Sequence, residues 1–190
     1  MKTILGCTLL ALGLSFSGVS RSWAEDNTVL YTNDFSSNPL DEAAGLKVND
    51  LSAVSWAKEV THSGKGSLKL TNGDKMKDVI AKGELIRFSG NRLTVSAEAK
   101  TENVAPGAQS WEKAMVQVYY YDENKRMIDY KWKGYNDMVP ISTGTSGWSV
   151  YEKTFVLPEA VKAAYIQVRC VMLHTTGTAW IDKVTVTAPN

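Results

Sequence analysis

Cysteine and histidine are scarce in this sequence, and neither sign of charge dominates it. The 190 residues include 2 Cys and 2 His, and the formal net charge at pH 7 is +1. A broad basic surface that neutralises phosphates is therefore not expected, and we predict no nucleic-acid partner. The chain also lacks the GxSxG, Walker, HExxH and CxxC motifs, and His62 and His174 have no nearby cluster of Cys or Asp for zinc. These absences argue against the common hydrolase, nucleotide-binding and zinc-binding classes.

Long hydrophobic runs are also missing. The apolar run at residues 4–19 is shorter than the roughly 20 residues that a membrane-spanning helix needs. It follows a basic N-terminus and precedes Ser22 and Ala24, which are small residues at the positions of a cleavage site, and this order is typical of a secretory signal peptide. We predict a signal peptide at 1–24 and a single domain at 25–190. The mature protein would be secreted or periplasmic and would have no integral membrane segment.

Removal of the signal peptide would leave one cysteine. Cys7 lies in the apolar run, so the mature chain would carry only Cys170 and no internal disulfide. Its core must then hold it together. Cys170 falls on the apolar side of an alternating segment, which predicts a buried small hydrophobe rather than a nucleophile.

Most of the chain alternates between apolar and polar residues with a period of two, which is typical of half-buried β-strands. The predicted strands are 28–35, 52–60, 66–71, 78–88, 93–99, 114–121, 126–133, 148–157, 163–172 and 179–187. A hairpin turn is predicted at 122–125, and helical signals occur only at 39–45 and 158–163, both too short for crossover helices. The pattern predicts an all-β fold, an antiparallel β-sandwich or jelly roll with at most short helical turns.

Aromatic residues with a polar group are abundant. The chain has 6 Trp and 8 Tyr against 4 Phe. Such rings suit a wet surface, and sugar rings offer flat C–H faces surrounded by hydroxyls. The candidate carbohydrate-binding residues are Tyr119, Trp132, Gln117, Arg169, Gln167, Glu98, Tyr121, Trp111 and Tyr135. Those on strands are expected on the face opposite the core. Tyr119 and Trp132 would stack on sugar rings, and the polar side chains would form hydrogen bonds with sugar hydroxyls. Alternatively, Glu98 and Arg169 would form a salt bridge with only a structural role.

The last predicted strand contains an unusual carboxylate. Alternation turns Asp182 inward together with Val184 and Val186, and a buried carboxylate is costly unless it is paired or binds a cation. Calcium accepts carboxylate and backbone carbonyl oxygens. A structural calcium site between Asp182 and the glycine-rich turn at 63–66 is one interpretation. Hydrogen bonds from backbone amides to Asp182 are the other.

Several segments, taken in order, resemble the carbohydrate-binding modules of bacterial cellulases and xylanases, which have a galactose-binding-like jelly roll. The segments are YTNDFSS (31–37), HSGKGSLKL (62–70), RLTVSAEAKT (92–101), VQVYYYDENKRMI (116–128), GWSVYEKTFVLPEAVKAAYIQVRC (147–170) and TAWIDKVTV (178–186). The resemblance covers residues 28–187. It implies a non-catalytic module with a glycan in the groove of one sheet, and a glycoside hydrolase as a companion.

The resemblance also implies a structural calcium away from the glycan. Its ligands would be Asp182, backbone oxygens near Ser63 and Lys65, and an acidic residue near the first strand. The family often has Glu after the opening Phe, where this chain has Ser36, so Asp34 would have to substitute. No organic cofactor is implied.

The sequence therefore predicts an exported, non-catalytic domain that binds a polysaccharide or oligosaccharide. Two alternatives stay open. One is a structural or adhesive domain whose aromatic face contacts another protein. The other is a jelly-roll polysaccharide lyase, for which Tyr119, Gln117, Arg169 and His174 are suitable residue types.

Overall fold

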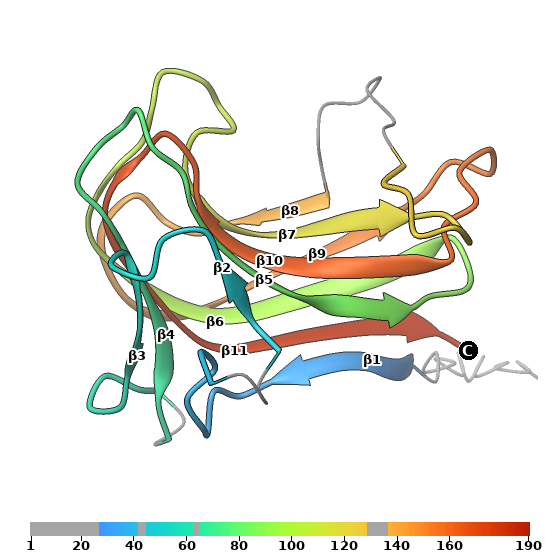
Figure 1. Cartoon of the computed structure of the whole chain (residues 1–190), viewed down its shortest axis with the longest axis horizontal. Helices are drawn as coiled ribbons and strands as arrows, with labels where there is room; N and C mark the ends of the chain where they lie inside the picture. The colour runs from blue at the N-terminus through green and yellow to red at the C-terminus, as the bar shows by residue number, and fades with distance from the viewer. Residues whose placement is uncertain (1–26, 42–44, 63–64, 129–136) are drawn as a thin grey trace, which may run out of the picture.

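The computed structural model describes residues 27–41, 45–62, 65–128 and 137–190, and these residues form β-strands and no helix (Figure 1). The strands are β1 (Asn27–Asn33), β2 (Lys47–Val48), β3 (Val54–Ala57), β4 (Ser67–Asn72), β5 (Val79–Arg87), β6 (Arg92–Ala105), β7 (Ala114–Tyr121), β8 (Asp137–Pro140), β9 (Gly144–Val156), β10 (Tyr165–Met172) and β11 (Thr176–Pro189). No helix among the described residues is long and apolar enough to cross a membrane.

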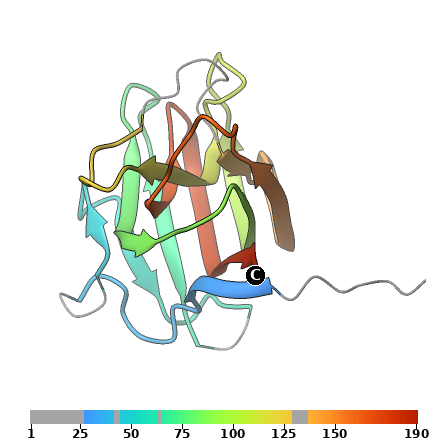
Figure 2. The same ribbon diagram turned by 90° about the vertical axis from the view of Figure 1, so that its right-hand side faces the viewer.

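The strands form two antiparallel sheets that face each other (Figures 1 and 2). In the first, here called the β10 sheet, the order is β2-β5-β10-β7-β8. In the second, the β11 sheet, the order is β3-β4-β11-β6-β9, and β1 pairs with the end of β11. Most neighbouring strands are far apart in the sequence, as in a jelly roll. The predicted all-β sandwich is confirmed.

The core lies between the sheets and follows the predicted alternation. On β6 the inward residues Leu93, Val95, Ala97 and Ala99 are at most 1% exposed. The inward residues of β7 and β10, among them Tyr120 and Cys170, are at most 5% exposed. Burial raises the pKa of the Cys170 thiol to about 12, so this residue is the buried hydrophobe that the sequence predicts and not a nucleophile.

The structure differs from the set of predicted strands at three places. The turn at 122–125 is present, with the Lys125 amide donating to the Asp122 carbonyl, but residues 126–128 add only an isolated bridge between Tyr121 and Met127. The rest of the predicted strand 126–133 lies outside the described residues. β2 and β8 were not predicted, because a strand of 2 or 4 residues is too short to display a period of two.

Asp182 is buried, as predicted, although the strand is not regular there. The register of β11 against β6 shifts between Ile181 and Lys183, so Asp182 is the extra residue of a β-bulge. Its side chain is 0% exposed, and its Oδ2 accepts hydrogen bonds from the Thr61 hydroxyl at 2.7 Å and the His62 amide at 2.6 Å. The carboxylate thereby fixes the segment between β3 and β4 against the β11 sheet.

Candidate functional site

The outer face of the β10 sheet brings together five of the predicted residues. β7 contributes Gln117, Tyr119 and Tyr121, and the adjacent β10 contributes Gln167 and Arg169. The register places Gln167 opposite Tyr119 and Arg169 opposite Gln117. Residues directly opposite in an antiparallel pair are near enough for their side chains to interact. The prediction that these five share the face opposite the core is correct in geometry.

A hydrogen-bond network holds this part of the face in one arrangement. The Arg169 guanidinium lies over the Tyr119 ring, with Cζ 3.7 Å from the centroid. Arg169 donates from Nε to Gln167 Oε1 and from Nη2 to the Tyr121 hydroxyl, each at 3.0 Å. The Tyr121 hydroxyl donates to Gln167 Oε1 at 3.0 Å, and the Gln167 amide donates to the Gly83 carbonyl at 2.9 Å. Tyr119 is therefore held before any ligand arrives, which reduces the entropy lost on binding.

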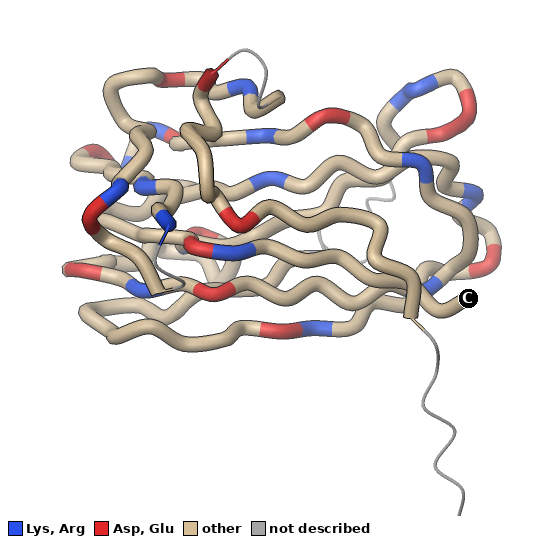
Figure 3. The backbone as a smooth tube through the Cα atoms, turned by 90° about the horizontal axis from the view of Figure 1, so that it is seen from below, with Lys and Arg blue, Asp and Glu red and all other residues tan. Residues whose placement is uncertain are grey.

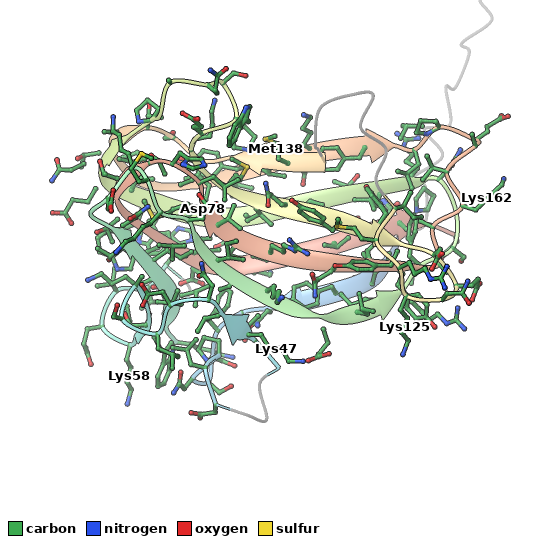
Figure 4. The ribbon with its side chains drawn as sticks, turned by 45° about the horizontal axis from the view of Figure 1, so that its top comes forward. Lys47, Lys58, Asp78, Lys125, Met138 and Lys162 are labelled. Atoms are coloured by element: carbon green, nitrogen blue, oxygen red, sulfur yellow. The ribbon has the colours of Figure 1, made fainter. Side chains whose placement is uncertain are left out.

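Beside this network lies a pocket of about 250 Å³. Its lining consists of Asp78, Trp111, Gln117, Tyr119, Met138, Leu173 and His174. Figure 4 labels two of these, Asp78 immediately before β5 and Met138 on β8. Gln117 is 6% exposed, and its side chain donates a weak hydrogen bond of 3.4 Å from the amide nitrogen to the Met115 sulfur. Aromatic walls with a buried amide form a site that offers both apolar contact and a directed hydrogen bond.

The segments before β7 and after β10 form one wall of the pocket. The Trp111 and His174 rings meet edge to face, with centroids 5.6 Å apart. His174 has a φ of 45°, which is uncommon for a residue with a Cβ, and its amide donates to Asp78 Oδ1 at 3.2 Å. A Cβ on Gly107 would lie 2.6 Å from the His174 carbonyl oxygen, so only glycine allows this close packing. The wall is thus built by contacts between distant segments.

Sequence reasoning found part of this pocket. It identified Trp111, Gln117 and Tyr119, and it considered His174 only for a lyase. It missed Asp78, Met138 and Leu173, whose places depend on how β5, β8 and the end of β10 meet. The polar Asp78 at the start of a predicted strand was the only local signal. Trp132 and Tyr135 lie outside the described residues, so their roles stay predictions.

Glu98 does not belong to this face, and its predicted grouping with Gln117 and Arg169 is wrong. It lies on β6, in the β11 sheet, where its carboxylate pairs with His62 Nδ1 at 2.7 Å. Strand alternation identified it correctly as outward-facing, but a sandwich has two outer faces. The Glu98–Arg169 salt bridge is excluded for the same reason.

The residues predicted to bind calcium differ in how well they suit a cation. Asp182 is engaged by donors of the protein itself, and Ser63 lies outside the described residues. Lys65 Nζ is 3.5 Å from Asp34 Oδ2, and hydrogen bonds from Ser36 lower the pKa of Asp34 below its ordinary value. Calcium takes oxygen ligands, so an ammonium group beside Asp34 does not suit that residue as a ligand. Asp182 fits better, being a buried carboxylate.

Basic and acidic residues are interspersed along the chain rather than separated into blocks (Figure 3). This agrees with the small net charge of +1. The electrostatic interactions of the outer face of the β10 sheet therefore depend on the local arrangement of its charged residues rather than on the net charge of the chain.

No family model matches the chain, and no curated protein matches it. Several solved structures are similar to it in fold. The CBM22-1–GH10 modules of Clostridium thermocellum endo-1,4-β-D-xylanase 10B, complexed with xylohexaose, are similar with a TM-score of 0.57 at 14% identity, over 86% of this chain and 29% of that chain. The CBM22-1 xylan-binding domain of Paenibacillus barcinonensis Xyn10C gives 0.51 at 11% identity, over 86% and 96%. The enzymatically active domain of bacteriophage CBA120 tailspike protein 4 gives 0.52 at 12% identity, over 75% and 18%.

These similarities define the fold. The protein has the galactose-binding-like β-sandwich of carbohydrate-binding modules, and the resemblance predicted from the ordered segments is confirmed at the level of fold. The chain covers less than a third of the xylanase and tailspike structures, and nearly all of the isolated xylan-binding domain.

Proposed function

We propose that this chain is a non-catalytic domain that binds a polysaccharide or oligosaccharide on the outer face of the β10 sheet. The observation that carries the proposal is the pocket between Trp111 and Tyr119, with the buried amide of Gln117 in its lining. The fold adds support, because two similar structures are a xylan-binding domain and a module pair complexed with xylohexaose. Fold alone does not fix function, so the proposal depends on the site.

The pocket suits a sugar ring in two respects. The rings of Trp111 and Tyr119 offer apolar surface to the C–H face of a pyranose, and the Gln117 carbonyl can accept a hydrogen bond from a hydroxyl. Arg169 and Tyr121 contribute through the network that holds Tyr119 in place. Few contacts of this kind leave a weak, reversible complex, with a dissociation constant roughly between millimolar and micromolar.

Export, the signal peptide at 1–24 and an accompanying glycoside hydrolase belong to the same proposal. A domain that binds polymeric glycan and performs no chemistry is useful where it meets the polymer outside the cell and beside an enzyme. Cys170, the one cysteine among the described residues, is free and buried, so the apolar core between the sheets stabilises the domain there.

Affinity electrophoresis tests the proposal. The protein from residue 25 onward would be run in native gels cast with xylan, β-glucan, mannan, pectin or alginate. Selective retardation, with no growth of absorbance from unsaturated products, is the expected result. Product formation on alginate or pectin would instead identify a lyase. Equal mobility in all gels would overturn the proposal and favour the protein-interaction alternative.

A further inference from the structure

One row of residues crosses the outer face of the β10 sheet from edge to edge. The strand registers place Lys47 on β2 opposite Lys82 on β5, and Lys82 opposite Arg169 on β10. Arg169 lies opposite Gln117 on β7, and Gln117 lies opposite Met138 on β8. Figure 4 labels both ends of this row, Lys47 and Met138. Three cationic residues are thus consecutive neighbours, and the row leads directly to the pocket, whose lining includes Gln117 and Met138.

Only one of the three cations has a carboxylate partner among the described residues. Lys47 Nζ lies 3.0 Å from Glu84 Oε1. Lys82 and Arg169 have no ion pair within the described part of the chain, although both are half-buried. Like charges directly opposite on a sheet are destabilising. The pairing of Lys82 with Arg169 is therefore unfavourable in the free domain, and it becomes favourable when an anion lies over both side chains.

Arg169 is also prepared to bind such an anion. A guanidinium has five N–H donors, and two of those on Arg169 are used, by Gln167 and by the Tyr121 hydroxyl. The remaining donors have no acceptor among the described residues, while stacking on Tyr119 fixes the plane of the group. Planar donors in a fixed orientation recognise carboxylates well, often with two hydrogen bonds.

We propose that the ligand of this face is an acidic glycan, one whose uronic acid residues place a carboxylate between Lys82 and Arg169 while a neighbouring ring enters the pocket at Gln117 and Tyr119. This inference rests on the proposed sugar-binding function and narrows it to a substrate class. The net charge of the chain does not oppose it, because Lys82 and Arg169, which have no ion pair among the described residues, lie on adjacent strands and act locally.

A matched pair of polymers tests the inference. Polygalacturonate and alginate would each be compared with the same polymer after reduction of its carboxylates to alcohols, in affinity gels and by titration of tryptophan fluorescence. We expect about tenfold tighter binding of the unreduced polymers, as one charge-assisted contact would give. Raising the salt concentration should weaken only the binding of the acidic polymers.

Two variants complete the design. Lys82→Gln should weaken binding of the acidic polymer about fivefold and leave binding of the reduced polymer unchanged. Lys183→Gln is the control, since it removes one exposed positive charge from the β11 sheet. Equal weakening by both variants would indicate unspecific attraction and overturn the inference.

The polymer results separate the two proposals. Equal binding of acidic and reduced polymers, or binding of neutral polymers alone, would overturn the inference and leave the sugar-binding function standing. Binding of dextran sulfate at least as tight as that of the uronates would overturn the choice of carboxylate. Binding of no polymer would overturn both proposals.

Discussion

Two adjacent tyrosines on β7 should respond to mutation in opposite ways. Tyr119 lies on the outer face, half-buried beneath the Arg169 guanidinium and in the lining of the pocket. Tyr120 points into the core and is 2% exposed. The substitutions Tyr119→Ala and Tyr120→Ala remove the same atoms from neighbouring positions, so each is the control for the other.

The magnitudes follow from these two environments. Tyr119→Ala loses a cation–π contact of about 0.5–1 kcal/mol, which lowers Tm by only a few degrees. If a sugar covers about 50 Å² of the ring, the loss of binding free energy is about 1.3 kcal/mol, or roughly tenfold in Kd. Tyr120→Ala leaves a cavity in the core and costs about 3–5 kcal/mol, which lowers Tm by roughly 6–20 °C.

The assay combines thermal unfolding with affinity electrophoresis on whichever polymer the wild type binds. Tyr119→Ala should unfold near the wild-type temperature and be retarded much less than the wild type in the polymer gel, with an apparent Kd roughly tenfold higher. A Tm lowered as much by Tyr119→Ala as by Tyr120→Ala would refute the assignment of Tyr119 to an open binding face. Retardation equal to that of the wild type would show that Tyr119 does not contact the glycan.

Three further predictions concern the wall of the pocket, the core and the bulge. Gly107→Ala should displace the segment that carries Trp111 and weaken glycan binding several-fold, measured by the same gels, because its Cβ would collide with the His174 carbonyl. Alkaline pH should destabilise the fold, because burial raises the pKa of the Cys170 thiol from 9.0 to about 12 and that of the Tyr31 phenol from 10.0 to about 12. The folded state holds the thiol and phenol protons more tightly than the unfolded state does, so the contribution of these groups to the free energy of unfolding is complete below about pH 9 and is lost as the pH rises toward 12. In Cys170→Ala this loss should be smaller, as measured by urea unfolding at a series of pH values. Asp182→Ala should cost about 1–3 kcal/mol by leaving the Thr61 and His62 donors without their acceptor. If Asp182 holds the calcium that the family resemblance implies, millimolar calcium will raise the Tm of the wild type relative to EDTA but not that of Asp182→Ala, and equal wild-type values would exclude the calcium site.

The local pattern of the sequence predicted the strands and their faces well. The alternation in 114–121 correctly assigned Tyr120 to the core and Tyr119 to the surface, because successive side chains of a strand point to opposite sides. The same rule placed Arg169 outside and Cys170 inside on β10. It failed where the strand is very short, as at β2 and β8.

The sequence by itself determined that this is an all-β sandwich with a continuous apolar core, because period-two burial is a property of each strand alone. Only the tertiary structure decided which strands are neighbours. It separated Glu98 from Arg169 on opposite faces of the sandwich, brought Asp78 and Met138 to the pocket beside Gln117, and aligned Lys47, Lys82 and Arg169 in one row. Strand pairing joins segments that are tens of residues apart, and the alternation within a single strand contains no information about its partner.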